Sequence, residues 1–174
     1  MQGLAIFLVT GSLVPAVWSD ENIEISTYVP VPGSSIDGAR MTRSVAQSIP
    51  NNTPTKIMFN AEAFDIGDIA NPATGRFTVK KAGMYLITGS WWLSLSGEEQ
   101  IAEVYIYVNG APVKKSRSVH GSLGTQDISA ETTDVLMLAV NDTVEMYVLQ
   151  TRGNSNTTYP QSDYQPRMAV IQLQ

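Results

Sequence analysis

Few residues of this chain have side chains suited to acid–base or nucleophilic chemistry. His120 is the only histidine among 174 residues, and cysteine is absent. His120 lies in a loop rich in serine and glycine, with Ser118 and Asp127 as its nearest polar candidates. Because a catalytic nucleophile needs both a base and a group that orients the base, we expect His120 to be a solvated loop histidine. The composition excludes thiolate zinc sites, iron–sulfur clusters and histidine-pair metal sites.

Carboxylates are the remaining groups that could do chemistry. Glu98, Glu99 and Asp127 would be the acids of a glycan-cleaving enzyme, but nothing in the sequence fixes their geometry. The nucleophile motif Gly-x-Ser-x-Gly is absent. We therefore predict no catalytic residues, and an enzyme acting on glycans is the alternative that this prediction sets aside.

Three acidic residues lie close together in an expected loop and are the only candidate metal ligands. Glu62, Asp65 and Asp68 supply the oxygen atoms that calcium prefers. Their spacing does not match an EF-hand, and acidic loops are usually only solvated. Calcium is thus the one cofactor for which the sequence offers ligands, and we predict that no cofactor is required.

Composition bounds the class of protein. Apolar residues make up 43% of the chain, the net charge is −5 and the isoelectric point is about 4.7. This length fits one domain with a short extension. The absence of a basic stripe argues against nucleic-acid binding. Without disulfides, the fold must be stabilised by burial, to which oligomerisation can add.

The first 38 residues differ in composition from the rest of the chain. An apolar run near the start is broken by Gly11 and Pro15, so it is too short to span a bilayer. No Lys or Arg precedes it, unlike a secretory signal. We expect residues 1–38 to be an extended arm with a Pro/Gly/Ser linker, packed on its own trimer or anchored to a larger assembly. The anchor candidates are Leu4, Ile6, Phe7, Leu8 and Val9.

Residues 39–174 are dominated by strand and turn patterns. Short apolar stretches alternate with Gly, Pro, Asn and Asp, and no window favours an amphipathic helix. Asn109-Gly110 is a hairpin signal because both residues tolerate positive φ. The pattern predicts an antiparallel β-sandwich or jelly roll. The expected strands are Ala46–Ile49, Thr55–Asn60, Arg76–Val79, Met84–Leu95, Ile101–Val108, Pro112–Arg117, Asp127–Leu138, Thr143–Gln150 and Arg167–Leu173.

Several short sequence motifs in residues 39–174 occur in the order found in one protein family. They are Thr74-Gly75 with Phe77, then Gly83-Met84-Tyr85-Leu86-Ile87, Val108-Asn109-Gly110, Asp134–Leu138 followed by Asn141-Asp142-Thr143-Val144, and Met168–Leu173. Together they resemble the C1q-like branch of the C1q/tumour-necrosis-factor jelly-roll superfamily. Ile87 replaces the usual Phe, Asn141 replaces the usual Gly, an aromatic before Thr74 is missing, and no collagen repeat precedes the domain. The opening residues 43–53 resemble phrases in C1q-like domains of bacteriophage structural proteins.

The resemblance implies an all-β antiparallel jelly-roll β-sandwich that forms a non-enzymatic homotrimer. The residues it assigns to the trimer interface or core are Phe77, Tyr85, Ile87, Trp91, Tyr105, Tyr107, Met146 and Val148. It suggests a virion knob on a phage capsid or tail, serving decoration, stabilisation or adhesion to a host-surface glycan or protein. Tyr159 and Tyr164, in the long polar loop 152–165, are the candidate ligand-binding residues. The alternative is a secreted or cell-surface binding module with an atypical signal segment.

Overall fold

A computed structural model describes residues 5–9, 12–16, 36–96, 100–121, 124–161 and 163–173. The chain divides into two units, Met1–Ser34 and Ser35–Gln174. The described residues contain only strands, turns and irregular segments. None of them forms a helix long and apolar enough to cross a membrane.

The described residues of the first unit form an antiparallel pair of strands, β1 (Ala5–Val9) and β2 (Ser12–Ala16). Four of the candidate anchor residues, Ile6 to Val9, belong to β1, whereas Leu4 lies outside the described residues. Their role as an anchor stays a prediction.

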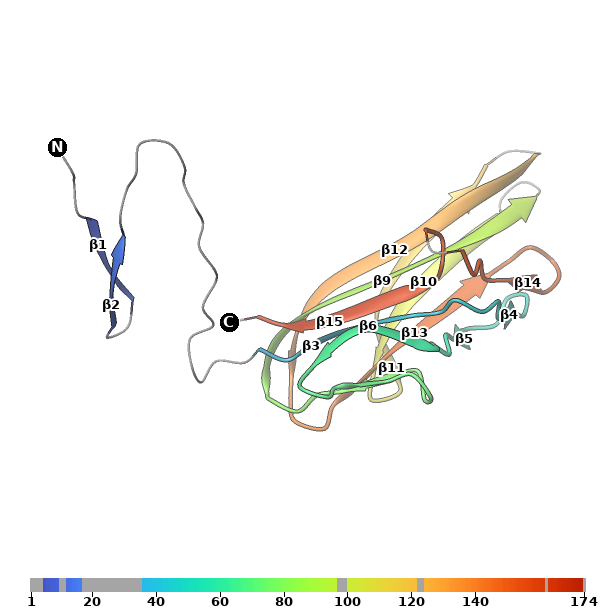
Figure 1. Cartoon of the computed structure of the whole chain (residues 1–174). Helices are drawn as coiled ribbons and strands as arrows, with labels where there is room; N and C mark the ends of the chain where they lie inside the picture. Colours follow the sequence, from blue (N-terminus) through green and yellow to red (C-terminus); the bar gives the residue numbers. More distant parts are fainter. Residues whose placement is uncertain are drawn as a thin grey trace. The chain divides into compact units, whose positions relative to one another are not determined.

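The second unit is a sandwich of two antiparallel sheets (Figure 1). The β9 sheet has the order β12 (Thr125–Leu138), β9 (Gly83–Ser96), β15 (Arg167–Gln172), β3 (Gly38–Thr42) and β6 (Ala61–Ile66). The β13 sheet has the order β11 (Ala111–His120), β10 (Gln100–Val108), β13 (Thr143–Gln150), β8 (Arg76–Thr78) and β7 (Ala70–Asn71), with β5 (Thr55–Lys56) also paired to β13. A small pairing joins β14 (Asn156–Thr157) to β4 (Ser48–Ile49). Because β15 lies between β9 and β3, the sheets interleave distant parts of the chain, as in a jelly roll.

The core forms because alternate residues of each long strand point between the sheets. Along β9 the inward residues include the two largest fully buried side chains, Trp91 and Tyr85. Met146 of β13 faces them, and a Cβ added at Gly89 would lie 3.1 Å from its sulfur atom. Glycine at position 89 thus allows the two sheets to approach closely at this point. The remaining core members on these strands are Ile87, Leu93, Val144 and Val148.

Two turns show the backbone conformations that the sequence suggested. Asn109 and Gly110 have φ values of 52° and 79°, which confirms the hairpin between β10 and β11. Asn141 has a φ of 72°, and its N–H donates to the Val79 carbonyl at 2.8 Å. Asparagine is among the few residues other than glycine that adopt this conformation readily, so the replacement of glycine at position 141 preserves the turn.

The strand predictions were good for the long strands and poor near the start of the sandwich. β13 has the predicted bounds, and β8, β9, β10, β12 and β15 agree within two residues. The predictions of strands over residues 46–49 and 55–60 were wrong in extent, because only Ser48–Ile49 and Thr55–Lys56 pair. β3 and β6 were missed. β6 lies at a sheet edge with mostly exposed residues, so it lacks the apolar alternation that marks a strand.

We expect Trp91→Ala to lower the free energy of unfolding by about 3–5 kcal/mol, because it removes a fully buried indole from between the sheets. Urea unfolding followed by fluorescence or circular dichroism would measure the change. Val113→Ala, at an exposed position of β11, is the matched control and should change stability by less than about 0.5 kcal/mol. Equal effects of the two substitutions would contradict this description of the core.

Candidate functional site

The outer face of the β9 sheet carries apolar side chains from four of its five strands at one end. Val135 on β12 pairs with Leu86 on β9, which pairs with Ile171 on β15. The pairing continues through Gly38 on β3 to Ile66 on β6. Because residues paired across strands share a face, these side chains form one surface. We define the apolar patch as Phe64, Ile66, Met84, Leu86, Val135, Met137 and Ile171.

Most of this apolar patch is exposed to solvent in the single chain. Met137 is 77% exposed, Ile66 is 52% exposed and Val135 is 48% exposed. An apolar surface with side chains from four of the five strands of a sheet is larger than scattered surface residues would produce, and such surfaces usually mark interaction sites. The outer face of the β9 sheet is therefore a candidate interface.

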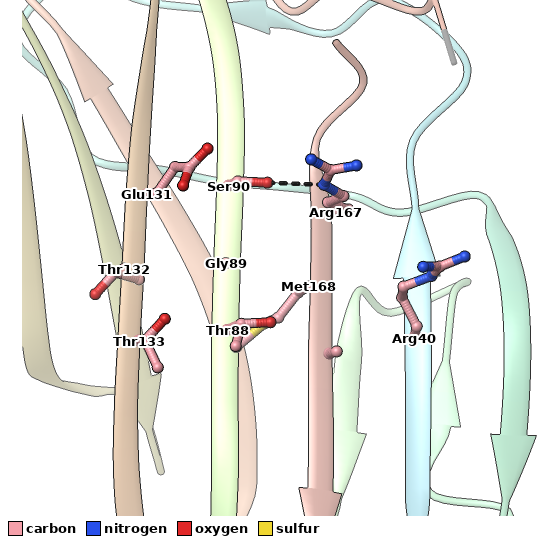
Figure 2. A pocket seen from close by; sticks show the side chains of 10 residues that line it. Arg40, Thr88, Gly89, Ser90, Glu131, Thr132, Thr133, Arg167 and Met168 are labelled. Atoms are coloured by element: carbon pink, nitrogen blue, oxygen red, sulfur yellow. Dashed lines mark hydrogen bonds between the residues drawn. The ribbon is translucent and has the colours of Figure 1, made fainter. Parts of the chain in front are cut away.

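A polar groove of about 400 Å³ lies on the same sheet, lined by residues of β12, β9, β15 and β3 that include Glu131, Ser90, Arg167 and Arg40 (Figure 2). The Arg167 Nε donates to Ser90 Oγ at 3.1 Å, and Glu131 lies beyond Ser90 on β12. The Arg40 guanidinium lies 6.0 Å from the centre of the Phe64 ring. No ion pair within the described part of the chain involves Arg40, Arg167 or Glu131. The groove thus presents charges of both signs to a partner.

An aromatic cluster lies near the other end of β9. The rings of Trp92 and Tyr164 meet edge to face at 5.1 Å, and Tyr164 lies 6.1 Å from Tyr159. The Tyr159 hydroxyl donates to Asp127 Oδ1 at 2.6 Å. Burial raises the pKa of Tyr159, and its hydrogen bond to the Asp127 carboxylate raises the pKa further. The two tyrosines proposed from the sequence as a ligand-binding pair therefore lie together, and Trp92 joins them.

The residues that the resemblance assigned to interface or core separate into two groups. Six are fully buried between the sheets of one chain, so they shape the sandwich without reaching another molecule: Phe77, Tyr85, Ile87, Trp91, Met146 and Val148. Tyr105 and Tyr107 instead lie on the outer face of the β13 sheet, where both are half-buried. Their role at an interface stays a prediction.

Tyr105 and Tyr107 belong to a charged and aromatic surface on the β13 sheet. Tyr107 stacks on Tyr147 with ring centres 4.0 Å apart, and Tyr105 lies 6.2 Å from Tyr107. The Lys115 ammonium group lies 5.8 Å from the Tyr105 ring. We call this the tyrosine–cation surface, which comprises Lys56, Arg76, Glu103, Tyr105, Tyr107, Lys115, Arg117, Glu145 and Tyr147.

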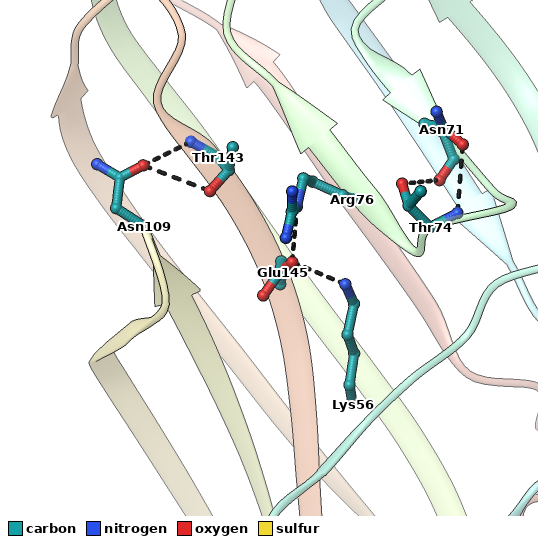
Figure 3. Close-up of polar contacts among 7 residues, drawn as sticks. All are labelled: Lys56, Asn71, Thr74, Arg76, Asn109, Thr143 and Glu145. Carbon is teal, nitrogen blue, oxygen red and sulfur yellow. Dashed lines mark hydrogen bonds and ion pairs between the residues drawn. The ribbon is translucent and has the colours of Figure 1, made fainter.

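Two nearly buried glutamates organise the cations of the tyrosine–cation surface. Glu145 Oε1 accepts from Lys56 Nζ at 2.7 Å and from Arg76 Nε at 2.8 Å (Figure 3). Glu103 Oε1 pairs with Arg117 at 2.6 Å and with Lys115 at 3.4 Å. Each carboxylate is therefore shared by two cations.

Hydrogen bonds and charge determine the protonation of these groups. Burial alone would raise the pKa of Glu103, but hydrogen bonds from Tyr105 and Arg117 and the charge of Lys115 outweigh it and lower the pKa. Burial likewise opposes ionisation of Glu145, and Lys56 and Arg76 again lower its pKa overall. For Tyr105, burial raises the pKa, and its hydrogen bond to Glu103 raises it further.

The other candidates from the sequence occupy less promising positions. His120 is only 1% exposed at the end of β11, so the expectation of a solvated loop histidine was wrong. Glu62 and Asp65 lie in β6 rather than in a loop, and Asp65 accepts hydrogen bonds from the Ile69 and Ala70 N–H groups. Asp68 follows β6 in a turn.

No cluster of three or more potential metal ligands occurs among the described residues. That no cofactor is required stays a prediction. Glu98 and Glu99 lie outside the described residues.

Sequence reasoning missed Glu103 and Glu145 as organisers of a surface. The alternation of Glu103, Tyr105 and Tyr107 on one face of β10 was a usable signal, since residues two apart share a face of a strand. The partners on β13, β8, β5 and β11 were not accessible from the sequence, because only the strand order brings them together.

We expect the ion pairs of Glu145 and Glu103 to make the folded chain less stable as the pH falls into the acidic range. The pKa of Glu145 and the pKa of Glu103 are lower in the folded chain than in the unfolded chain. Their contribution to the free energy of unfolding is therefore fully present above pH 4.5, the ordinary glutamate pKa, and is lost as the pH falls through the lowered pKa values of the folded chain. Urea midpoints measured from neutral pH to about pH 3 should fall less steeply for Glu145→Gln than for the wild type. Glu62→Gln, at an exposed position of β6, should keep the wild-type slope. An unchanged slope for Glu145→Gln would contradict the assignment.

Comparisons with known proteins concern the fold. No family model matches the sequence, and no curated protein matches it. The globular domain of zebrafish complement 1qA protein aligns with a TM-score of 0.56 and 16% identity, over 79% of this chain and 96% of that one. Eiger TNF from S. frugiperda aligns with a TM-score of 0.56 and 14% identity, over 80% and 93%. Murine APRIL, crystallised at pH 8.0, aligns with a TM-score of 0.59 and 10% identity, over 80% and 100%. The sandwich therefore has the C1q/TNF jelly-roll fold, as the resemblance implied.

Proposed function

We propose that this chain is a non-enzymatic binding module that assembles as a homotrimer through the outer face of the β9 sheet. The observation that carries the proposal is the apolar patch, which has side chains from four of the five strands of that sheet and is largely exposed in the single chain. Burying such a surface against further copies stabilises an assembly through the hydrophobic effect. Members of the C1q/TNF superfamily are typically homotrimers, which supports the stoichiometry.

The polar groove suits contact between copies related by rotation. In a head-to-tail ring, different parts of the face meet, so a positive group of one copy can lie against a negative group of the next. Arg40, Arg167 and Glu131 provide both signs on this face. Opposite charges beside an apolar patch favour one register of association over others.

The setting that we propose is a bacteriophage virion, with the N-terminal arm anchoring the knob to a capsid or tail. The apolar residues near the start, the linker over residues 20–38 and the phage-like phrase at residues 43–53 support it. The role would be decoration, stabilisation or adhesion to the host surface. Finding the protein in purified particles would support this setting, whereas its absence from them would contradict it.

The alternative setting is a secreted or cell-surface module. The apolar run followed by Val17-Trp18-Ser19 favours it, since this sequence could precede a cleavage site. Mass spectrometry of the mature protein distinguishes the two settings. A chain that begins near Asp20 would favour secretion, and a chain that retains the arm would favour the anchor.

Charge placed within the apolar patch should prevent assembly without unfolding the chain. We expect light scattering of the full chain to give three times the chain mass of 18.9 kDa. Met137→Glu combined with Val135→Glu should give monomers, because the interface would have to bury two unpaired carboxylates.

Val119→Glu is the matched control, since Val119 is 61% exposed but lies on the other sheet. It should leave the trimer intact. Circular dichroism would show that both variants retain the β fold. A wild-type monomer, or a trimer that persists in the Met137/Val135 variant, would contradict assembly through this face.

A further inference from the structure

We propose that the tyrosine–cation surface binds an acidic polysaccharide. The inference rests on the proposed binding function and names the class of ligand and the surface that recognises it. Lys56, Arg76, Lys115 and Arg117 surround two nearly buried carboxylates there, with three tyrosines between the two clusters.

The cations of this surface exceed what its carboxylates neutralise. Glu145 is shared by Lys56 and Arg76, and Glu103 is shared by Arg117 and Lys115. One cation balances each carboxylate, so one positive charge remains in each cluster. This local excess stands out on a chain with a net charge of −5 and would attract anionic groups over a Debye length.

The cations are held in place yet still accessible. The side chains of Arg76, Lys115 and Arg117 are 46%, 49% and 50% exposed, while those of Glu145 and Glu103 are 5% and 3% exposed. The buried glutamate side chains thus hold the more exposed cationic side chains in position. The outward N–H donors can form charge-assisted hydrogen bonds to a ligand at little further cost in side-chain entropy.

The two cationic clusters are too far apart for one small anion. Glu103 and Tyr107 are four residues apart on β10, and Tyr107 pairs with Glu145 on β13. At about 3.3 Å per residue, this places the clusters roughly 13 Å apart along the strands. A polymer with repeated negative groups can reach both clusters at once, whereas a single phosphate or carboxylate cannot.

The tyrosines favour a sugar polymer over other polyanions. Tyr105, Tyr107 and Tyr147 lie between the clusters and contact one another through their rings. A tyrosine offers an apolar ring with a polar hydroxyl, which matches a sugar ring with its C–H faces and hydroxyl groups. A nucleic acid would require a larger basic surface than two excess charges provide. A carboxylate-rich peptide would gain little from the rings.

This surface stays available in the proposed assembly. It lies on the outer face of the β13 sheet, and the apolar patch lies on the outer face of the β9 sheet, on the opposite side of the sandwich. A trimer formed through the β9 sheet would present three copies of the tyrosine–cation surface outward. Several weak contacts to one polymer then combine through multivalency.

The test removes the excess charges and leaves each glutamate paired. In Arg76→Gln/Lys115→Gln, Glu145 keeps Lys56 and Glu103 keeps Arg117. Lys80→Gln/Lys114→Gln is the matched control, because it removes the same two charges at exposed positions where the structure shows no ion pair among the described residues. Biolayer interferometry on the full chain would use immobilised heparin and alginate, with dextran, poly-glutamate and single-stranded DNA as comparison polymers.

We expect the wild type to bind heparin or alginate and not to bind dextran, which is uncharged. Binding to the acidic polysaccharides should weaken as the salt concentration rises. Arg76→Gln/Lys115→Gln should weaken binding at least about tenfold, and the lysine control should stay within about twofold of the wild type. Tyr107→Leu should weaken binding to the polysaccharides while keeping the wild-type β-sheet spectrum.

Three results would overturn the proposal. One is failure of the wild type to bind either acidic polysaccharide. Another is equal loss of binding in the two double variants, which would show a dependence on net charge alone. The third is binding of poly-glutamate or single-stranded DNA as tight as that of the polysaccharides. Light scattering on the same variants tests assembly separately, so a trimer that binds no polysaccharide would refute this inference and leave the proposed assembly standing.

Discussion

The two-residue alternation of the long antiparallel strands is the constraint on which the rest of this structure depends. In β9, β10 and β13 every second side chain points between the sheets, and the intervening side chains point outward. Because strand pairing fixes the register, a shift of one residue would expose Trp91 and Tyr85 and bury Trp92 and Thr88. The burial of the large inward residues therefore also fixes which residues each outer face presents.

The two outer faces differ in chemistry, although both come from strands of similar length. The β9 sheet presents methionine, valine and isoleucine at one end and charges of both signs beside them. The β13 sheet presents tyrosines and cations around two glutamates. Burying the apolar side chains of the first face against an apolar partner would be favourable, because it removes apolar surface from water. The second face keeps its charged groups hydrated and suits an exposed polar ligand.

The nearly buried glutamates show how a sheet surface can hold charge firmly. A carboxylate removed from water is costly unless cations and hydrogen bonds compensate for it. Glu145 meets this condition through β5 and β8, and Glu103 meets it through β11. The short strands β5 and β8 thus contribute more than backbone pairing, since each places one cation over the centre of the β13 sheet.

Sequence patterns alone were enough to predict the class of fold and most of the long strands. Apolar alternation in residues 84–95, 101–108 and 143–150, together with the Asn109-Gly110 turn, depends only on local geometry, so it could be recognised along the chain. The family phrases extended this to the C1q/TNF jelly roll. The candidate surfaces depended on the tertiary structure. Val135, Leu86, Ile171 and Ile66 come from four separate strands, and their sharing of one face follows from strand order, which one-dimensional periodicity does not encode. The same holds for the burial of His120 and for the pairing of Glu145 with Lys56 and Arg76, because contacts between residues distant along the chain exist only once the sheets have formed.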